Sequence, residues 1–429
     1  MSEWSLVVRP AVLLLLGAVA ASPLFPQHPD PLFAEIPFNQ WFEGPEETGM
    51  RWSARVSRPR LSTHQRLSAE LEVSLDGVEL AKRRGKGQLF VLAQLNDAKG
   101  QAFQDHGTIE LDKIEEGVSK QDVTCTLTAF ILPGDYGVSL ALFFTSTGEH
   151  SVKREKLHVP PLKNDPLPEA WRDLPAVEFI EDGEPPDSWY LPSVTGRLHL
   201  PLEARRPARI DVIVNLTPSE KASGSERIQG RNLGALLPAL KAIAAVDRRN
   251  ASLNVALLDL SRQRVLFHQD DVSALDWSGM RDALTGQDPG KIDLKSLENR
   301  GHDAAFFVTE VRRRLGAGPE EQARALVVLS SPVAFERGED LEPIRLTSAP
   351  DCRVFYFRCR PQTILQPPQE EPARGRRPGF VRPIRFGPGP QIDQLEPTLK
   401  PLAPRLFDIE TPEQFRKALA AVLSEISSM

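Results

Sequence analysis

The segment RIDVIVNLTPSE, residues 209–220, decides the fold class of the C-terminal half of the chain. Its first part, 210–214, is a short and mostly apolar run of the kind found in strands that are covered on both faces of a parallel sheet. Side-chain oxygens follow at Asn215, Thr217 and Ser219, and Glu220 closes the segment. Ligands of open α/β sheets bind at the carboxyl ends of the strands. The loop is therefore the first candidate site.

Strands and helices alternate downstream of this segment. The pattern predicts strands at 253–260, 264–268, 324–330 and 352–358 and helices at 233–246 and 303–315, followed by a short strand and a last helix that begins after Thr411. Pro238 is expected to lie near the start of the first helix or to kink it. Apolar strands that alternate with helices predict a doubly wound α/β domain over 197–429, with a mostly parallel sheet.

The N-terminal part has a period of two. Apolar residues alternate with polar ones over 67–75, and further strands are predicted at 88–95, 108–111, 123–131 and 136–144. Turn residues separate them, and Asp76-Gly77 reads as a hairpin signal. Short strands at this spacing, without a helical stretch, predict an all-β, immunoglobulin-like sandwich over 50–160. Residues 161–196 are rich in proline and acid, which predicts a stiff connector between the two domains.

Length and composition agree with a multidomain folded protein. The chain has 429 residues, enough for two or three domains, and 41% hydrophobic and 26% charged residues are ordinary globular values. The net charge of −6 argues against a general nucleic-acid binder, which would carry a basic stripe. The three cysteines do not form a disulfide framework. Cys352 and Cys359 stand at the two ends of a predicted strand, too far apart to bond.

The N-terminus predicts export. The apolar run AVLLLLGAVAA at 11–21 is shorter than the roughly 20 residues that span a bilayer, and Ala18-Val19-Ala20 provides a cleavage site. We therefore expect a signal peptide at 1–22 and a secreted, periplasmic or cell-surface protein whose mature chain has no transmembrane span. An uncleaved anchor that borrows residues 6–8 is the alternative.

Four stretches together resemble a von Willebrand factor type A (VWA) domain, and in particular the divergent VWFA-related proteins of acidobacteria. These stretches are RIDVIVNLTPSE (209–220), the helix at 303–315, ALVVLSSP (325–332) and RLFDIETPEQFRKALAAVLSEI (405–426). The resemblance covers roughly 197–429 and concerns the pattern and order of elements rather than a strict motif. It implies a Rossmann-type fold and a role in protein–protein contact.

The family's metal site uses a D-x-S-x-S loop after the first strand, a threonine before a later helix and an aspartate after the fourth strand. The matching positions here are Asn215, Thr217 and Ser219, with Ser330 and Ser331 in place of the later Thr-Asp-Gly. Magnesium is usually held by at least one or two carboxylates. The resemblance therefore implies a degenerate metal-ion-dependent adhesion site, without a metal cofactor.

Two acids are candidates to restore the lost charge. They are Asp303, near the position of the family's threonine, and Glu220. Their ordinary roles would be a helix cap and a solvated surface acid. The remaining oxygens either bind a partner directly or only satisfy the loop backbone, and the sequence leaves both readings open.

A proline- and arginine-rich insertion at 366–390 interrupts the α/β pattern. Its arginines are candidates for contact with an anionic glycan, lipid headgroup or acidic protein surface: Arg374, Arg376, Arg377, Arg382 and Arg385. A solvated insertion without a partner is the alternative.

No short catalytic motif is present. The chain lacks a G-x-S-x-G elbow, an H-E-x-x-H helix, a C-x-x-C pair and a P-loop. The sequence therefore favours an exported, non-enzymatic binding or adhesion-type protein that contacts another protein through its VWA-like domain. One alternative is a structural module of an envelope complex that uses the arginine-rich insertion. Another is an extracytoplasmic hydrolase assembled from distant residues, with His268 near Asp270 or His302 beside Asp303.

Overall fold

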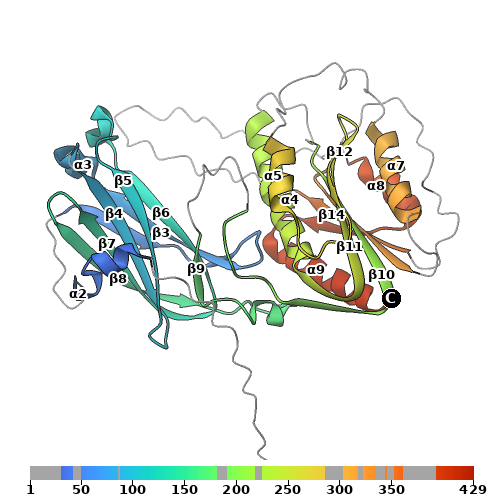
Figure 1. Ribbon diagram of the computed structural model, residues 1–429, viewed down its shortest axis with the longest axis horizontal. Coiled ribbons are helices and arrows are strands. Elements are labelled where there is room, and N and C mark those ends of the chain that lie inside the picture. The colour runs from blue at the N-terminus through green and yellow to red at the C-terminus, as the bar shows by residue number, and fades with distance from the viewer. Residues whose placement is uncertain are drawn as a thin grey trace, which may run out of the picture.

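A computed structural model describes most of the chain. The described residues are 30–41, 50–85, 87–180, 191–217, 225–285, 303–316, 322–333, 344, 352–360 and 393–429. The expected signal peptide at 1–22, the loop residues Ser219 and Glu220, His302 and the insertion at 366–390 lie outside them. Three sheets dominate the described part, with helices around the third (Figure 1). The expectation of a multidomain, β-rich chain is confirmed at this level.

The first two sheets are antiparallel and form the N-terminal part. One has the order β1-β3-β6-β9, with β2 beside β3, and the other has the order β5-β4-β7-β8. The strands of the first are β1 (Trp52–Val56), β2 (Arg60–Leu61), β3 (Leu67–Leu75), β6 (Val123–Ile131) and β9 (Val177–Phe179). Those of the second are β4 (Gln88–Asn96), β5 (Ala102–Glu110), β7 (Gly134–Phe144) and β8 (His150–Val159). Alternate residues of both sheets enter one apolar core, as the period of two requires.

The hairpin expected at Asp76-Gly77 is wrong. These residues begin helix α3 (Gly77–Arg83), and Asp76 Oδ1 accepts a hydrogen bond from the Val78 backbone N–H at 2.7 Å. The physical reason is that β3 and β4 belong to different sheets, so the chain must cross over instead of turning back. A Cβ at Gly77 would lie 1.9 Å from the carbonyl oxygen of Val118 in the 3₁₀ turn η1 (Glu116–Lys120), so this crossover needs glycine.

Residues 161–196, which the sequence predicts to be a connector, also contribute to the first sheet. They supply the 3₁₀ turn η2 (Pro168–Trp171) and strand β9, which pairs with β6 and so completes the first sheet. The Tyr136 hydroxyl donates to the Leu132 carbonyl at 2.9 Å and lies 3.3 Å from the Ala176 carbonyl.

On the outer face of the second sheet, the short helices α1 (Leu32–Glu35) and α2 (Phe38–Trp41) bury a separate apolar cluster.

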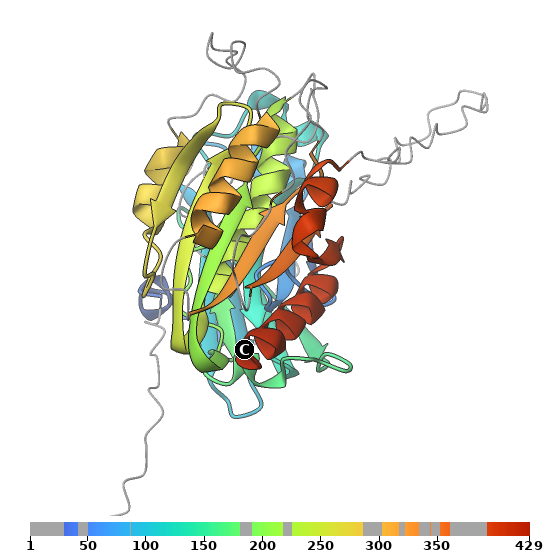
Figure 2. The same ribbon diagram turned by 90° about the vertical axis from the view of Figure 1, so that its right-hand side faces the viewer.

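The third sheet has six strands in the order β12-β11-β10-β13-β14-β15. They are β10 (Leu200–Asn215), β11 (Val246–Asp259), β12 (Arg264–Gln269), β13 (Ala323–Ser330), β14 (Cys352–Cys359) and β15 (Arg405–Ile409). All neighbours are parallel except β11 and β12, which are antiparallel. Figure 2 shows the long strands side by side. Cys352 and Cys359 stand at the two ends of β14, and none of the three cysteines forms a disulfide.

Helices cover both faces of this sheet. Val212 and Val214 belong to the core that contains residues of α4 (Ser225–Ala244) and α9 (Pro412–Ser427). Ile213 points the other way and packs in the cluster that includes residues of α7 (Asp303–Gly316) and α8 (Leu395–Leu399). Helix α5 (Trp277–Thr285) follows β12. Pro238 lies inside α4 and not near its start, because the helix begins earlier than the apolar pattern indicates.

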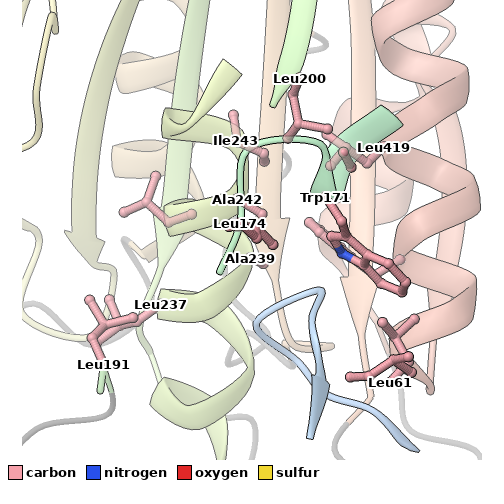
Figure 3. Close-up of a cluster of buried hydrophobic side chains, with 14 of the residues drawn as sticks. Leu61, Trp171, Leu174, Leu191, Leu200, Leu237, Ala239, Ala242, Ile243 and Leu419 are labelled. Atoms are coloured by element: carbon pink, nitrogen blue, oxygen red, sulfur yellow. The ribbon is translucent and has the colours of Figure 1, made fainter. Parts of the chain in front are cut away.

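A buried interface joins the sandwich to the α/β part. Apolar side chains from both parts belong to one buried cluster that includes Trp171, as Figure 3 shows: Leu61, Leu174, Leu191, Leu200, Leu237, Ala239, Ala242, Ile243 and Leu419. Arg416 of α9 donates to both carboxylate oxygens of Asp165, at 2.6 and 2.8 Å, and its guanidinium lies 4.7 Å from the centre of the Trp171 ring. The two parts therefore share one continuous core.

Candidate functional site

The carboxyl ends of four parallel strands place four polar side chains in one row. Asn215 of β10 pairs in register with Ser330 of β13, Ser330 with Arg358 of β14, and Arg358 with Asp408 of β15. In-register neighbours of a parallel sheet point to the same face. From β10 the sheet extends in both directions, to β11 on one side and to β13 on the other. The row therefore lies at the switch point where open α/β sheets bind ligands.

The candidate residues of this row are joined by hydrogen bonds. Asn215 Nδ2 donates to Ser330 Oγ at 2.9 Å, and Asn215 Oδ1 accepts from the Thr217 backbone N–H at 3.0 Å. Ser330 Oγ donates to the carbonyl of Ser331 at 2.6 Å. Thr217 Oγ1 accepts from the Leu260 backbone N–H at 2.7 Å. The structure thus brings together four of the five residues that the sequence singled out for this loop.

This network is buried and neutral. Asn215 and Ser330 have exposed fractions of 1% and 0%, and Thr217 and Ser331 are also buried. Amide and hydroxyl groups that bond to each other and to nearby backbone stabilise the loop. Of the two readings that the sequence left open, the geometry favours backbone satisfaction over direct contact with a partner.

The described residues of the Asn215 network do not fit a divalent cation. Magnesium requires hard oxygen ligands with negative charge among them, and the Asn215 network supplies only an amide and hydroxyls. Asp303 is the first residue of α7, but its side chain is outside the described set. Ser219 and Glu220 also lie outside it.

One buried carboxylate that sequence reasoning missed does reach this edge. Asp393, just before α8, has an exposed side-chain fraction of 4%. Its Oδ1 accepts from the Leu395 backbone N–H at 3.2 Å, and its Oδ2 accepts from the Tyr356 hydroxyl at 3.0 Å. The backbone N–H of Gln394 donates to the Val333 carbonyl at 2.8 Å, which fixes this segment against the end of β13. Asp393 therefore approaches the switch point from a distant part of the chain.

An arginine neutralises that carboxylate. Arg358 Nη1 lies 3.5 Å from Asp393 Oδ2 and 2.7 Å from Glu396 Oε2. Its Nε and Nη2 bind the two oxygens of Asp408 at 2.6 and 3.0 Å. The hydrogen bond from Arg358 lowers the pKa of Asp408 below its ordinary value. The guanidinium thus contacts three carboxylates at this edge. A charged residue inside the apolar strand VFYFRC was the sequence signal for such a cluster.

The outer rim of this cluster is accessible. The side chains of Glu396, Asp408 and Glu410 are each about half exposed, at 49%, 47% and 48%. Arg360 lies 3.5 Å from Asp408 and 3.8 Å from Glu410, and its side chain is also partly exposed. We call Glu396, Asp408 and Glu410 the acidic rim. It is the accessible part of the carboxyl edge among the described residues.

A cleft of about 740 Å³ lies at the opposite end of the sheet, where β10 and β11 begin. It holds a His199–Asp173 pair at 3.6 Å together with Ser252 and Ser273. Arg248 also lines it and donates to the carbonyls of Ala244, Val246 and Val272. Among the described residues, no hydrogen bond joins His199 to either serine.

The His268–Asp270 pair noted in the sequence lies on the surface. His268 and Asp270 lie 3.3 Å apart, and both side chains are more than half exposed. His302 lies outside the described residues. In the described part of the chain, no helix is long and apolar enough to cross a membrane.

Comparisons with known proteins add little. A scan against protein-family models and a search of curated proteins each returned no match. Among solved structures, the chain aligns with the X-ray structure of Northeast Structural Genomics Consortium target SoR45. That alignment has 14% sequence identity and a TM-score of 0.16, and it covers 28% of this chain and 92% of that one. A TM-score this low carries no argument about fold or function.

Proposed function

We propose that the protein is an exported, non-enzymatic binding protein that contacts a protein partner through a VWA-like domain, without a metal ion. The order of the third sheet supports the VWA-like assignment. Numbered along the chain, its six strands lie in the order 3-2-1-4-5-6, with an antiparallel strand at one edge. An immunoglobulin-like sandwich shares its core with this domain and holds it in a fixed position.

The observation that carries the metal-free proposal is the hydrogen bond from Asn215 to Ser330. Where the resembling family has carboxylates, this chain has an amide and a hydroxyl that bind each other. Stripping water from Mg²⁺ needs negative charge in the first shell of ligands. Asp393, a buried carboxylate at this edge, is already paired with Arg358.

The acidic rim is the proposed contact surface. Asp408 and Glu410 lie at the carboxyl end of β15, and Glu396 lies on α8. Their half-exposed side chains pair with Arg358 and Arg360 and also face solvent, where a partner's lysines or arginines can reach them. Electrostatic complementarity of this kind mainly sets specificity and the association rate. A partner that binds the acidic rim does not need access to the buried Asn215 network.

The test uses the full chain and its Glu410→Lys variant as bait in cross-linking from envelope extracts. Glu203→Lys is the matched control, because Glu203 is an exposed acid on the amino half of β10, in the same domain. We expect Glu410→Lys to reduce recovery of the cross-linked partner at least tenfold, and Glu203→Lys to leave it unchanged. Equal recovery with both variants would show that the acidic rim is not the contact surface.

The metal-free part is tested separately, by calorimetric titration of Mg²⁺ into the full chain and by cross-linking with a chelator. We expect no heat of binding and unchanged recovery of the partner. One equivalent of bound Mg²⁺, abolished by Asn215→Ala, would overturn the proposal.

A further inference from the structure

A second cluster of ligand-type side chains lies far from the α/β sheet. Asp105 and His106 are neighbours on β5, an edge strand of the sandwich, and Asp30 precedes helix α1. One possible ligand atom from each residue lies within 4.8 Å of those of the other two. Asp30 and His106 are 76 positions apart in the chain, so the cluster exists only because the N-terminal segment folds against this sheet.

Asp30 and His106 are each held in place by a second contact. Asp30 Oδ1 accepts a hydrogen bond from the Leu32 backbone N–H at 3.0 Å, which turns Oδ2 toward Nδ1 of His106. The His106 ring packs edge-on against Phe90, with 5.8 Å between ring centres. These two contacts restrict the orientation of the Asp30 carboxylate and of the His106 ring.

The cluster borders an apolar contact. His106 is paired across the strands with Leu92, which packs with Phe33, Ile36 and Phe38 of the N-terminal segment. The side chains of Asp30 and His106 are partly buried, with 15% and 32% exposed. Partial burial weakens screening by solvent, so charged groups interact more strongly here than on an open surface.

From these contacts we infer that Asp30, Asp105 and His106 form a binding site for a divalent transition-metal ion of the Zn²⁺ type. One imidazole and two carboxylates suit Zn²⁺, whereas Mg²⁺ and Ca²⁺ prefer oxygen ligands alone. Three protein ligands leave a fourth position for water. Because Asp30 comes from a different segment than the other two ligands, the bound ion fastens residues 30–41 to the outer face of the second sheet.

The experiment is a calorimetric titration of Zn²⁺ into the full chain, purified without a histidine tag and stripped of metal. His106→Gln and Asp105→Asn are the test variants. The control variant is His158→Gln. His158 forms a pair with Asp135 at 2.7 Å on the same sandwich, but both side chains are more than two-thirds exposed and belong to no three-ligand group among the described residues.

We expect one equivalent of Zn²⁺ to bind, with affinity reduced about 10- to 100-fold in both test variants and unchanged in the control. Bound Zn²⁺ should also slow proteolysis within residues 30–41. Asp105→Asn is decisive, because a simple His106–Asp30 ion pair does not depend on Asp105. Absence of stoichiometric binding, or binding equal in all variants, would overturn the inference. A heat of Mg²⁺ binding that persists in His106→Gln would come from the carboxyl edge of the third sheet and not from this cluster.

Discussion

Asn215 Nδ2 and Ser330 Oγ lie 2.9 Å apart across two neighbouring parallel strands, with both side chains buried. The pair closes the carboxyl end of the sheet between β10 and β13, where we propose a degenerate metal site. Its neutrality is as important as its geometry, because a buried amide and hydroxyl satisfy each other without a counter-ion. This relationship leads directly to the first prediction.

Asn215→Asp should place an uncompensated negative charge in the network. We expect a loss of about 1–3 kcal/mol in the free energy of unfolding in metal-free buffer at neutral pH, measured by urea denaturation. Mg²⁺ should recover part of this loss in the variant and have no effect on the parent chain. Asn164→Asp, in an exposed turn with φ of 54°, is the control and should change stability little. Equal stability of Asn215→Asp and the parent would contradict the neutral-network interpretation.

Arg358→Met should destabilise the protein strongly, because it leaves Asp393 buried without its guanidinium partner. Breaking a buried pair from one side costs about 3–5 kcal/mol. The double variant Arg358→Met/Asp393→Asn should recover a large part of that loss, which a thermal-melt series of single and double variants would measure. Arg360→Met removes a more exposed guanidinium and serves as the control, at about 0–1 kcal/mol. Additive effects of the two substitutions would argue against charge compensation.

Gly196→Ala should loosen the joint between the sandwich and the α/β part. A Cβ at this position would lie 2.7 Å from Glu178 Oε2 and 3.0 Å from Arg66 Nη1, which form a buried ion pair with each other. Overpacking of this kind costs about 1–3 kcal/mol. Gly117→Ala is the matched control, since nothing lies within 4 Å of a Cβ there. Chemical denaturation should show a lower midpoint only for Gly196→Ala.

Acid should weaken the carboxyl edge of the third sheet. The hydrogen bond from Arg358 lowers the pKa of Asp408 from its ordinary value of 3.8. A lowered folded-state pKa contributes stability that is fully present above the ordinary value and is lost as the pH falls through the folded-state pKa. The Asp408→Asn variant should therefore lose less stability than the parent between pH 5 and about pH 2, as followed by thermal melts. Parallel pH profiles would contradict this assignment.

Local sequence pattern was sufficient for several elements of the chain. The period of two over 67–75 matches β3, and Thr411 with Pro412 begins α9, where Thr411 and Gln414 form a reciprocal capping box. Such signals depend on residues a few positions apart, so they can be read without tertiary contacts. The same logic failed at Asp76-Gly77, because a turn and a helix start use the same residue types. Only the assignment of β3 and β4 to different sheets separates the two.

The sequence also marked Asn215, Thr217, Ser330 and Ser331 as members of one site, since the carboxyl ends of parallel strands meet at one edge. Tertiary structure alone decided that these residues are buried and bonded to each other. It also decided that Asp393 and Arg358 compensate each other there, and that Asp30 reaches His106 across the sandwich. Strand order and long-range docking set these contacts, and no local periodicity encodes the partner of a charge in a distant segment.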